Sequence, residues 1–416
     1  MAQVLAEAIT AGVCSAAAVA CGEGERARTW YAGTTRSWPT PGPAIGPATP
    51  FDLASLTKPM ATTLVAMRLL TAGRLDLGAL AARWLPALPS TITIAHLMGH
   101  ASGLPCHRPF YERLWAGDLG GSPDARTALV ALAASAPLDA RPGTVAVYSD
   151  LGYVTLGAVL ERAGDAPLED QTAAAHRDLG LDATTFVDLR HARASGPGAT
   201  TATAVSTRGP DPGATTASAV STRGPGLDAP SAIDVPRMQR ANPAATAGHA
   251  FAAPPVATEH DQRRGLVAGE VHDENCHAGG GIAGHAGLFA PLADVARFAA
   301  IMADAPRRGA PGVSAAVVAR CFTTSAAPRT SWRLGWDTPS SVPGVSHAGD
   351  AWPRAAAVGH LGFTGTSIWL DWARGRWLVL LSNRVHPDRL RPAAAGIKPL
   401  RRAVGDLACA LLAHGR

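Results

Sequence analysis

A hairpin pattern near the C-terminal end of the chain places the strongest constraint on its fold. The runs GTSIWLDW at 365–372 and RWLVLLSN at 376–383 are rich in aromatic and aliphatic residues, and a three-residue loop that ends in Gly375 separates them. Two such runs around a short glycine-containing loop are typical of paired antiparallel strands. The segment VCSAAAVACGEGERARTWYAGTT at 13–35 has the same form around a Gly-Glu-Gly turn. We therefore expect a β-hairpin near each end of the chain.

Helical patterns adjoin the hairpins and occupy the middle of the chain. The segment RRAVGDLACALLAHG at 401–415 has its apolar residues on one helical stripe. These patterns predict an α/β (α+β) fold in one domain over residues 1–416. An antiparallel sheet flanked by terminal helices would come from about 1–75 and 265–416, and a mostly helical lobe from about 76–264.

A tandem repeat interrupts this pattern. GATTATAVSTRGP at 198–210 recurs as GATTASAVSTRGP at 213–225, with Thr203 against Ser218 as the one difference. Two Gly/Thr/Pro-rich copies lack the apolar face that a stacked repeat fold needs. The composition predicts a flexible surface insertion over about 193–230.

The overall composition favours a globular protein and argues against several partners. The chain has 416 residues, of which 47% are hydrophobic and 17% charged, so it can bury a large core. The formal charge of +5 lies on scattered arginines among only 5% aromatic residues, so we expect no nucleic-acid partner. No apolar run is long enough to span a membrane. Glu7 interrupts the Ala-rich start, which also lacks a basic leading region, so we expect a cytoplasmic protein.

Six cysteines stand far apart in the sequence, without a C-x-x-C pair. A chain of this length does not need disulfides to hold a small core together. We expect reduced and mostly buried thiols.

The stretch ASLTKP at 54–59 carries the first candidate for catalysis. Lysine occurs only at Lys58 and Lys398, although the chain has 37 lysines and arginines. We predict a helix from about Ser55 to Leu70, in which a spacing of three residues puts Ser55 and Lys58 on one face. A buried lysine can lose its proton and activate a serine, whereas arginine stays protonated. The tetrapeptide S-x-x-K is common by chance, so other segments must support it.

Two later segments supply that support. Tyr148 and Asp150 lie at the head of a predicted helix that includes VTLGAVLERAG at 154–164. A phenol beside a lysine ammonium can have a lowered pKa and relay a proton, although a tyrosine met in isolation more often only packs its ring. In GHLGFTGTSIWLDW, His360 and Gly362 lead into the predicted strand. A small residue at a strand edge lets a substrate pair with the backbone, although such glycines are also ordinary turn residues.

In the order and spacing of three motifs, the chain resembles the serine β-lactamase and penicillin-recognising hydrolase superfamily. It is most similar to the class C-like branch, which includes D-amino-acid peptidases and family VIII esterases. The S-x-x-K, Y-x-N and K/H-T-G motifs match these residues: Ser55 with Lys58, Tyr148 with Asp150, and His360 with Gly362. Further similar stretches are TITIAHLMGHASGLP at 91–105, the segment 269–298, and LGWDTP at 334–339. The resemblance implies a β-lactamase/transpeptidase-like fold.

The resemblance also implies acyl transfer through an acyl-enzyme to water, without a metal ion or a cofactor. Ser55 would be the nucleophile and Lys58 its base or proton partner. Tyr148 would act as general base and then as acid to the leaving group, with His360 as a further catalytic residue. The amides of Ser55 and Phe363 would hold the oxyanion.

Two positions depart from the family pattern. Asp150 replaces asparagine, which removes an amide donor and adds negative charge near the substrate. Leu361 replaces threonine, which removes a hydroxyl that would help bind the carboxylate of a β-lactam or a terminal D-alanine. We therefore expect a serine hydrolase of small esters or amides. The alternatives are a β-lactamase or D-Ala-type peptidase, or a non-catalytic binding or sensor module on the same fold.

A group of histidines and acids follows at 272–285. His272, Asp273, Glu274, His277 and His285 could ligate zinc, but their spacing fits no H-E-x-x-H or similar pattern. We expect a hydrogen-bonded loop near the active site, in which Asp273 or His285 lines the pocket.

Overall fold

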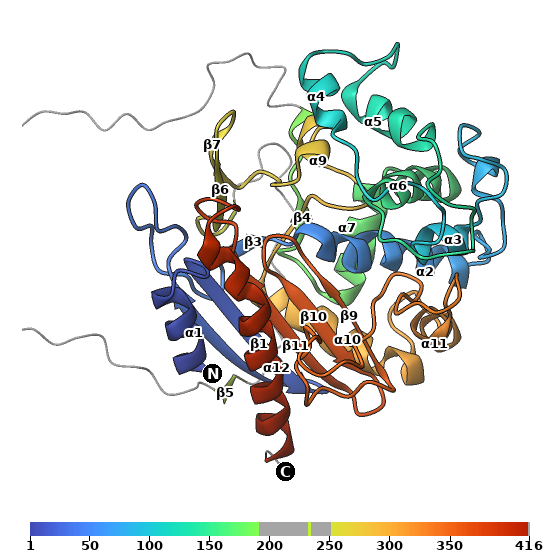
Figure 1. Ribbon diagram of the computed structural model, residues 1–416. Helices are drawn as coiled ribbons and strands as arrows, with labels where there is room; N and C mark the ends of the chain where they lie inside the picture. Colours follow the sequence, from blue (N-terminus) through green and yellow to red (C-terminus); the bar gives the residue numbers. More distant parts are fainter. Residues whose placement is uncertain (191–231, 234–250, 415–416) are drawn as a thin grey trace, which may run out of the picture.

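The computed structural model of the chain describes residues 1–190, 232–233 and 251–414 (Figure 1). The tandem repeat at 198–225 and the insertion predicted over 193–230 lie outside the described residues.

The main sheet is antiparallel and joins the two ends of the chain. Its strand order is β5-β2-β1-β11-β10-β9. The bounds of these strands are Ala232–Ile233 (β5), Arg26–Gly33 (β2), Ala16–Glu23 (β1), Arg376–Ser382 (β11), Ser367–Asp371 (β10) and Ala357–Leu361 (β9). Both predicted hairpins are confirmed, and Ala17 of β1 pairs with Ser382 of β11. This pairing places the N-terminal and C-terminal segments side by side, and the predicted α+β fold is confirmed.

Helices cover both faces of the sheet (Figure 1). The terminal helices α1 (Ala2–Thr10) and α12 (Ile397–Ala413) pack on one face, here called the outer face, and α10 (Leu292–Arg308) packs on the other. Strand β1 alternates between the two sides, because Ala17 belongs to the outer apolar cluster and Ala18 to the main core. The predicted C-terminal helix is confirmed and begins earlier than the sequence pattern indicated.

The described part of the chain also contains two smaller sheets and a group of helices. Strands β3 (Pro50–Asp52), β8 (Leu288–Pro291) and β4 (Thr185–Phe186) form one sheet, and β6 (Ala257–Asp261) with β7 (Gly265–Ala268) forms a hairpin. Further α-helices are α3 (Ile94–Met98), α4 (Phe110–Trp115), α5 (Ala125–Ala134), α6 (Asp150–Gly164), α7 (Leu168–Leu179), α9 (Glu274–Ala278) and α11 (Ala315–Thr323). None of the helices in these described parts is both long enough and apolar enough to cross a bilayer.

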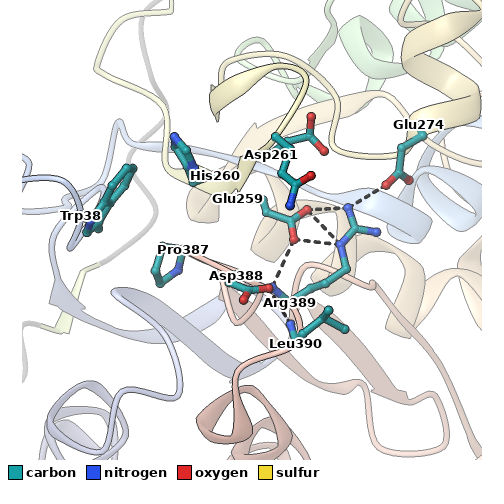
Figure 2. A pocket seen from close by; sticks show the side chains of 10 residues that line it. Trp38, Glu259, His260, Asp261, Glu274, Pro387, Asp388, Arg389 and Leu390 are labelled. Carbon is teal, nitrogen blue, oxygen red and sulfur yellow. Dashed lines mark hydrogen bonds and ion pairs between the residues drawn. The ribbon is translucent and has the colours of Figure 1, made fainter. Parts of the chain in front are cut away.

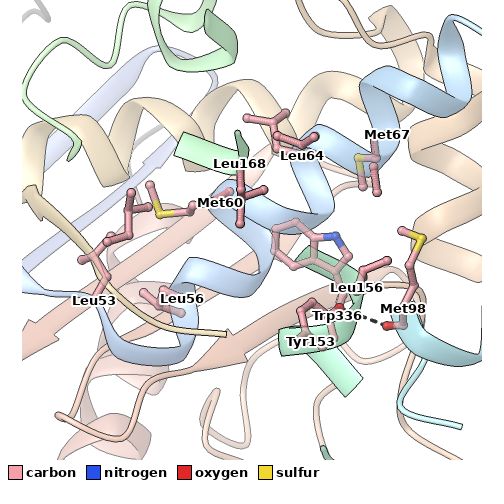
Figure 3. Packing of buried hydrophobic residues seen from close by; sticks show 14 of the residues in the cluster. Leu53, Leu56, Met60, Leu64, Met67, Met98, Tyr153, Leu156, Leu168 and Trp336 are labelled. Atoms are coloured by element: carbon pink, nitrogen blue, oxygen red, sulfur yellow. Dashed lines mark hydrogen bonds between the residues drawn. The ribbon is translucent and has the colours of Figure 1, made fainter. Parts of the chain in front are cut away.

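The helix predicted from Ser55 to Leu70 is not one regular α-helix. It consists of a 3₁₀ turn (Ala54–Leu56), a π-helical stretch (Lys58–Thr63) and α2 (Leu64–Thr71). Pro59 has no N–H to close an α-turn on the Ser55 carbonyl, so regular α-helix starts only further along. This segment supplies four core residues shown in Figure 3: Leu56, Met60, Leu64 and Met67.

All six cysteines lie within the described residues, and none of them forms a disulfide there. Four of the six are buried. The expectation that the thiols are mostly buried is confirmed.

Candidate active site

Ser55 lies in a strained turn directly after strand β3. The preceding residue, Ala54, has a φ of 47°, in the left-handed region that a residue with a side chain rarely adopts. Buried Asp52 holds the turn, because one carboxylate oxygen accepts the Ala54 N–H at 2.8 Å and the other accepts the His272 N–H at 2.7 Å. The Ser55 side chain keeps partial solvent access. A fixed backbone with an accessible hydroxyl suits a nucleophile.

Lys58 is fully buried beneath Ser55, and four oxygens surround its ammonium. The Nζ atom lies 3.0 Å from Ser55 Oγ, 2.6 Å from Tyr148 Oη and 2.7 Å from Asp150 Oδ1. The His285 carbonyl is more distant, at 3.3 Å. The three N–H groups of an ammonium match the three nearer oxygens. The structure thus brings together four of the predicted site residues, which are separated by up to 95 positions in the sequence.

Tyr148 bridges the nucleophile and the ion pair. Its phenol donates to Ser55 Oγ at 2.7 Å, and the following Ser149 caps helix α6 by accepting the Gly152 N–H. Burial first, and the Asp150 carboxylate second, raise the pKa of Tyr148 well above its ordinary value. The expectation that this pKa is lowered is wrong, because burial and the Asp150 carboxylate both raise it. The resting side chain is a neutral phenol.

His360 lies beside this group but does not hydrogen-bond to it. Its ring centroid is 6.2 Å from that of Tyr148, and its Nδ1–H donates to the Leu361 carbonyl at 2.9 Å. Burial first, and the charge of Lys58 second, lower the pKa of His360 to about 3. The ring is therefore neutral near pH 7, and its Nε2 has no hydrogen-bond partner in the described part of the chain. The neutral His360 ring therefore places an unprotonated Nε2, and not a positive charge, near Tyr148.

Two further rings that the sequence interpretation missed complete the wall around Tyr148. The His100 ring lies 4.7 Å from Tyr148, and the Trp332 ring lies 5.4 Å from Tyr148. His100 has a φ of 55°, and its Nδ1 accepts the Ser149 N–H at 3.1 Å. Burial, followed by the charge of Lys58, lowers the pKa of His100 well below its ordinary value. His100 falls in the family-like stretch 91–105, which was the only indication of its position.

The turn between β9 and β10 packs closely against the segment before Ser55. A Cβ atom at Gly362 would lie 2.0 Å from Thr366 Oγ1 and 2.7 Å from the Leu53 carbonyl, so only glycine fits. The hydroxyl of Thr366 donates to the Leu53 carbonyl, and that of Thr364 donates to the Asp52 carbonyl, each at 3.0 Å. These contacts hold the turn against the nucleophile segment.

The two amides predicted to bind an oxyanion are both free to do so. Neither the Ser55 N–H nor the Phe363 N–H has a hydrogen-bond partner among residues 1–190, 232–233 and 251–414. The Phe363 side chain is 48% exposed and stacks on His272 at 5.7 Å. The backbone at both positions thus has an unused donor.

The histidines at 272–285 separate into hydrogen-bonded pairs. His272 pairs with Glu259 at 2.8 Å, and His285 pairs with Asp273 at 2.9 Å. The charge of His285 holds the pKa of Asp273 below its ordinary range, although burial opposes this shift. No three metal-ligating side chains gather in the described residues. The His285 carbonyl faces Lys58, whereas its ring is almost fully buried.

A pocket of about 550 Å³ lies between the β6–β7 hairpin and the loop at 387–390 (Figure 2). Arg389 bridges Glu259 and Glu274 in this pocket, and its guanidinium lies 5.8 Å from the Phe363 ring. Ser55 does not line the pocket. The pocket and the serine are therefore separate features, linked through the contacts of Phe363.

The fold and the site together define an active-site serine hydrolase. A serine with a free amide receives hydrogen bonds from a buried lysine and a tyrosine, beside an antiparallel sheet covered by helices. A sequence model of the family described as Beta-lactamase matches residues 2–399. The chain belongs to the β-lactamase family, and it is a serine hydrolase.

This chain is similar in sequence to two named relatives, each about a quarter identical to it over the aligned residues. It is 26% identical over 349 residues to a putative D-alanyl-D-alanine carboxypeptidase of Escherichia coli K12, an alignment that covers 81% of this chain and 69% of that protein. It is 27% identical over 358 residues to an N-acetylmuramyl-L-alanine amidase of Bacillus subtilis 168, covering 83% and 70%. Its fold is similar to that of EstCE1, a hydrolase with promiscuous acyltransferase activity, with a TM-score of 0.62, 20% identity and coverage of 97% of both chains.

Proposed function

We propose that the protein hydrolyses small esters or amides through an acyl-enzyme formed on Ser55. The observation that carries this proposal is the pair of hydrogen bonds at Ser55 Oγ, from Lys58 Nζ at 3.0 Å and from Tyr148 Oη at 2.7 Å. A serine hydroxyl needs such neighbours, because it is a weak nucleophile until its proton has a place to go.

The proton path follows from the charges of the resting site. For the attack the Tyr148 hydroxyl turns from Ser55 Oγ toward Asp150. Ser55 Oγ then bonds to the substrate carbonyl carbon as its proton passes to Tyr148 Oη, and the Tyr148 proton passes to Asp150. This concerted transfer needs no free tyrosinate, in agreement with the raised pKa of Tyr148. The amides of Ser55 and Phe363 stabilise the oxyanion. Tyr148 then protonates the leaving group and takes back the proton held by Asp150, so that it stays neutral. A water molecule releases the acyl group by the same transfers, with water in place of Ser55 as the attacking group and Ser55 as the leaving group.

The surroundings favour uncharged substrates over carboxylate-bearing ones. The Leu361 side chain packs against the outer apolar cluster, and the hydroxyls of Thr364 and Thr366 are bound to backbone carbonyls. The β9–β10 turn therefore has no hydroxyl left to bind a substrate carboxylate. Val147, directly before Tyr148, and Phe363 are both about half exposed and provide apolar surface. Small esters with apolar acyl groups fit these features best.

The name of one relative, a putative D-alanyl-D-alanine carboxypeptidase, supports a second candidate, a peptidase that cleaves a terminal D-alanine. Both candidates use the same nucleophile. They differ in whether the site binds a terminal carboxylate, so a panel of substrates separates them.

A fluorophosphonate probe tests the proposed nucleophile. We expect one adduct, located on Ser55 by peptide mass spectrometry and missing in Ser55→Ala. Initial rates should be highest with short-chain p-nitrophenyl esters and lower with D-alanyl anilides and a chromogenic cephalosporin. Lack of an adduct in folded protein would support a non-catalytic binding module, and a cephalosporin rate equal to the ester rate would overturn the substrate preference.

A further inference from the structure

Arg401 of helix α12 is a buried cation without a carboxylate partner. The residue is 6% exposed, and no ion pair of its guanidinium is found in the part of the chain that the structure describes. Burial first, and the charge of Arg384 second, lower the pKa of Arg401 to about 9. An unpaired buried charge is unfavourable for folding, so its presence here requires a compensating role.

The contacts of Arg401 point to the turn between β9 and β10. Its Nη2 donates to the Gly362 carbonyl at 2.8 Å and to the Thr366 carbonyl at 2.7 Å. Each carbonyl also has a backbone donor, since Gly362 O accepts the Gly365 N–H at 3.1 Å and Thr366 O accepts the Gly362 N–H at 2.8 Å. Arg401 is therefore not needed to satisfy these carbonyls.

The bond to Gly362 fixes the direction of the neighbouring amide. The Gly362–Phe363 peptide is trans, so its C=O and N–H point in opposite directions. Arg401 comes from α12 on the outer face of the sheet (Figure 1) and holds the carbonyl toward that side. The Phe363 N–H consequently points away from α12. The hydroxyls of Thr364 and Thr366 fasten the same turn to the two residues before Ala54 and Ser55.

We propose that Arg401 is a positioning residue, which orients the Gly362–Phe363 peptide so that the Phe363 amide meets the oxyanion formed at Ser55. This inference rests on the proposed function, because it assigns Arg401 to the same acyl transfer. The guanidinium touches no reacting atom and acts through one peptide plane. The Gly362–Phe363 peptide is thereby held in one orientation before the substrate binds. An oxyanion site needs donors that are fixed in this way.

Three variants test this role: Arg401→Met, Arg401→Lys and, as a matched control, Arg402→Met. Arg402 lies next to Arg401 on α12, but its side chain is 33% exposed and pairs with Asp350. Each variant is assayed for kcat and KM with a p-nitrophenyl ester, for affinity to a boronic acid that forms a tetrahedral adduct on the serine, and for its thermal midpoint.

For Arg401→Met we expect kcat and boronate affinity to fall together by about 10- to 100-fold, a part of the loss seen when an oxyanion donor is removed. KM should change by less than about threefold, because the Phe363 amide stabilises the oxyanion of the transition state more than the carbonyl of the bound substrate. The thermal midpoint should stay equal or rise, since an unpaired buried charge is removed. Arg401→Lys should regain part of kcat, and Arg402→Met should match the wild type.

A folded Arg401→Met variant with wild-type kcat and boronate affinity would refute the positioning role while the ester hydrolysis of the wild type remains. A loss of kcat that follows a lowered thermal midpoint, without rescue by lysine, would also overturn it in favour of a purely structural role. If the wild type itself neither binds the boronate nor cleaves the ester, the proposed function fails and the role of Arg401 fails with it.

Discussion

Lys58 Nζ lies 2.7 Å from Asp150 Oδ1, so the buried cation of the site has a carboxylate partner within one hydrogen bond. Lys58 is fully buried, whereas the Asp150 side chain is 18% exposed. A buried ammonium without a partner would be strongly unfavourable. Burial first, and this carboxylate second, raise the pKa of Tyr148. One departure from the Y-x-N pattern therefore supplies the counter-charge of the buried lysine and adds to the effect of burial on the phenol.

Replacement of Lys58 should abolish the chemistry. Lys58→Met leaves Asp150 unpaired beside Ser55 and removes a hydrogen-bond donor from Oγ. We expect fluorophosphonate labelling of Ser55 to slow by about 10³-fold or more, and the free energy of unfolding to fall by about 3 kcal/mol. Lys58→Arg should also label slowly, because a planar guanidinium cannot take the place of a compact ammonium among three close oxygens and does not lose its proton.

Lys398→Met is the matched control, since Lys398 is the other lysine of the chain and lies at the start of helix α12. It should label at the wild-type rate. A wild-type labelling rate in Lys58→Arg would remove lysine from the proposed mechanism.

Asp150→Asn should separate the two effects of the carboxylate. Asparagine lacks the charge that raises the pKa of Tyr148, so the phenol should titrate at lower pH than in the wild type. Asparagine also has no site for the proton that Tyr148 releases, so we expect kcat at pH 7 to fall by about 10²-fold. Ultraviolet difference titration, with Tyr148→Phe to identify the signal, measures the first effect. An unchanged kcat would exclude Asp150 as the proton acceptor.

The framework of the fold could be predicted because its determinants are local in the sequence. The apolar runs that form β10 and β11, and the helical stripe of α12, are visible without knowledge of their partners. Strand β9 was missed, because AVGHL at 357–361 has no clear alternation and only one strong β-former, Val358. Its pairing with β10 stabilises it, and that pairing is not visible in the segment itself.

The sequence allowed the reactive residues of the site to be predicted, but not how these residues act on one another. Ser55, Lys58 and Tyr148 stood out because a nucleophile, an amine and a phenol occur at meaningful spacings. The direction of the Tyr148 pKa shift depends on burial and on the position of Asp150 next to Lys58, which only the folded structure determines. Arg401 is one of many arginines, and its importance follows from the packing of α12 behind the β9–β10 turn.

Gly362→Ala should disturb the turn behind the nucleophile. A Cβ atom there would lie 2.0 Å from Thr366 Oγ1 and 2.7 Å from the Leu53 carbonyl, so the turn and the segment before Ser55 must move apart. We expect kcat to fall by about 10²-fold, since misplacement of about 1 Å has effects of this size. Gly46→Ala is the control, because a Cβ at Gly46 meets no atom within 4 Å. If both variants keep wild-type kcat, the fit at Gly362 is not required for catalysis.

The pH dependence of stability should report the buried His360. Burial and the charge of Lys58 lower the pKa of His360 from 6.5 to about 3. Between these two values the unfolded chain binds a proton at this side chain and the folded protein does not. The stabilising effect of the neutral ring is therefore complete above pH 6.5 and decreases as the pH falls toward 3.

His360→Asn should reduce this acid-induced loss of stability. Asparagine keeps an amide donor near the position of Nδ1, which donates to the Leu361 carbonyl, but takes up no proton in this range. At pH 4.5 the wild type should lose about 3 kcal/mol more of its unfolding free energy, relative to pH 7.5, than the variant does, since pH 4.5 lies two units below 6.5 and each unit corresponds to about 1.4 kcal/mol. Urea unfolding at the two pH values measures the difference. Equal slopes in His360→Asn and the wild type would mean that His360 is already protonated in the folded protein at pH 4.5.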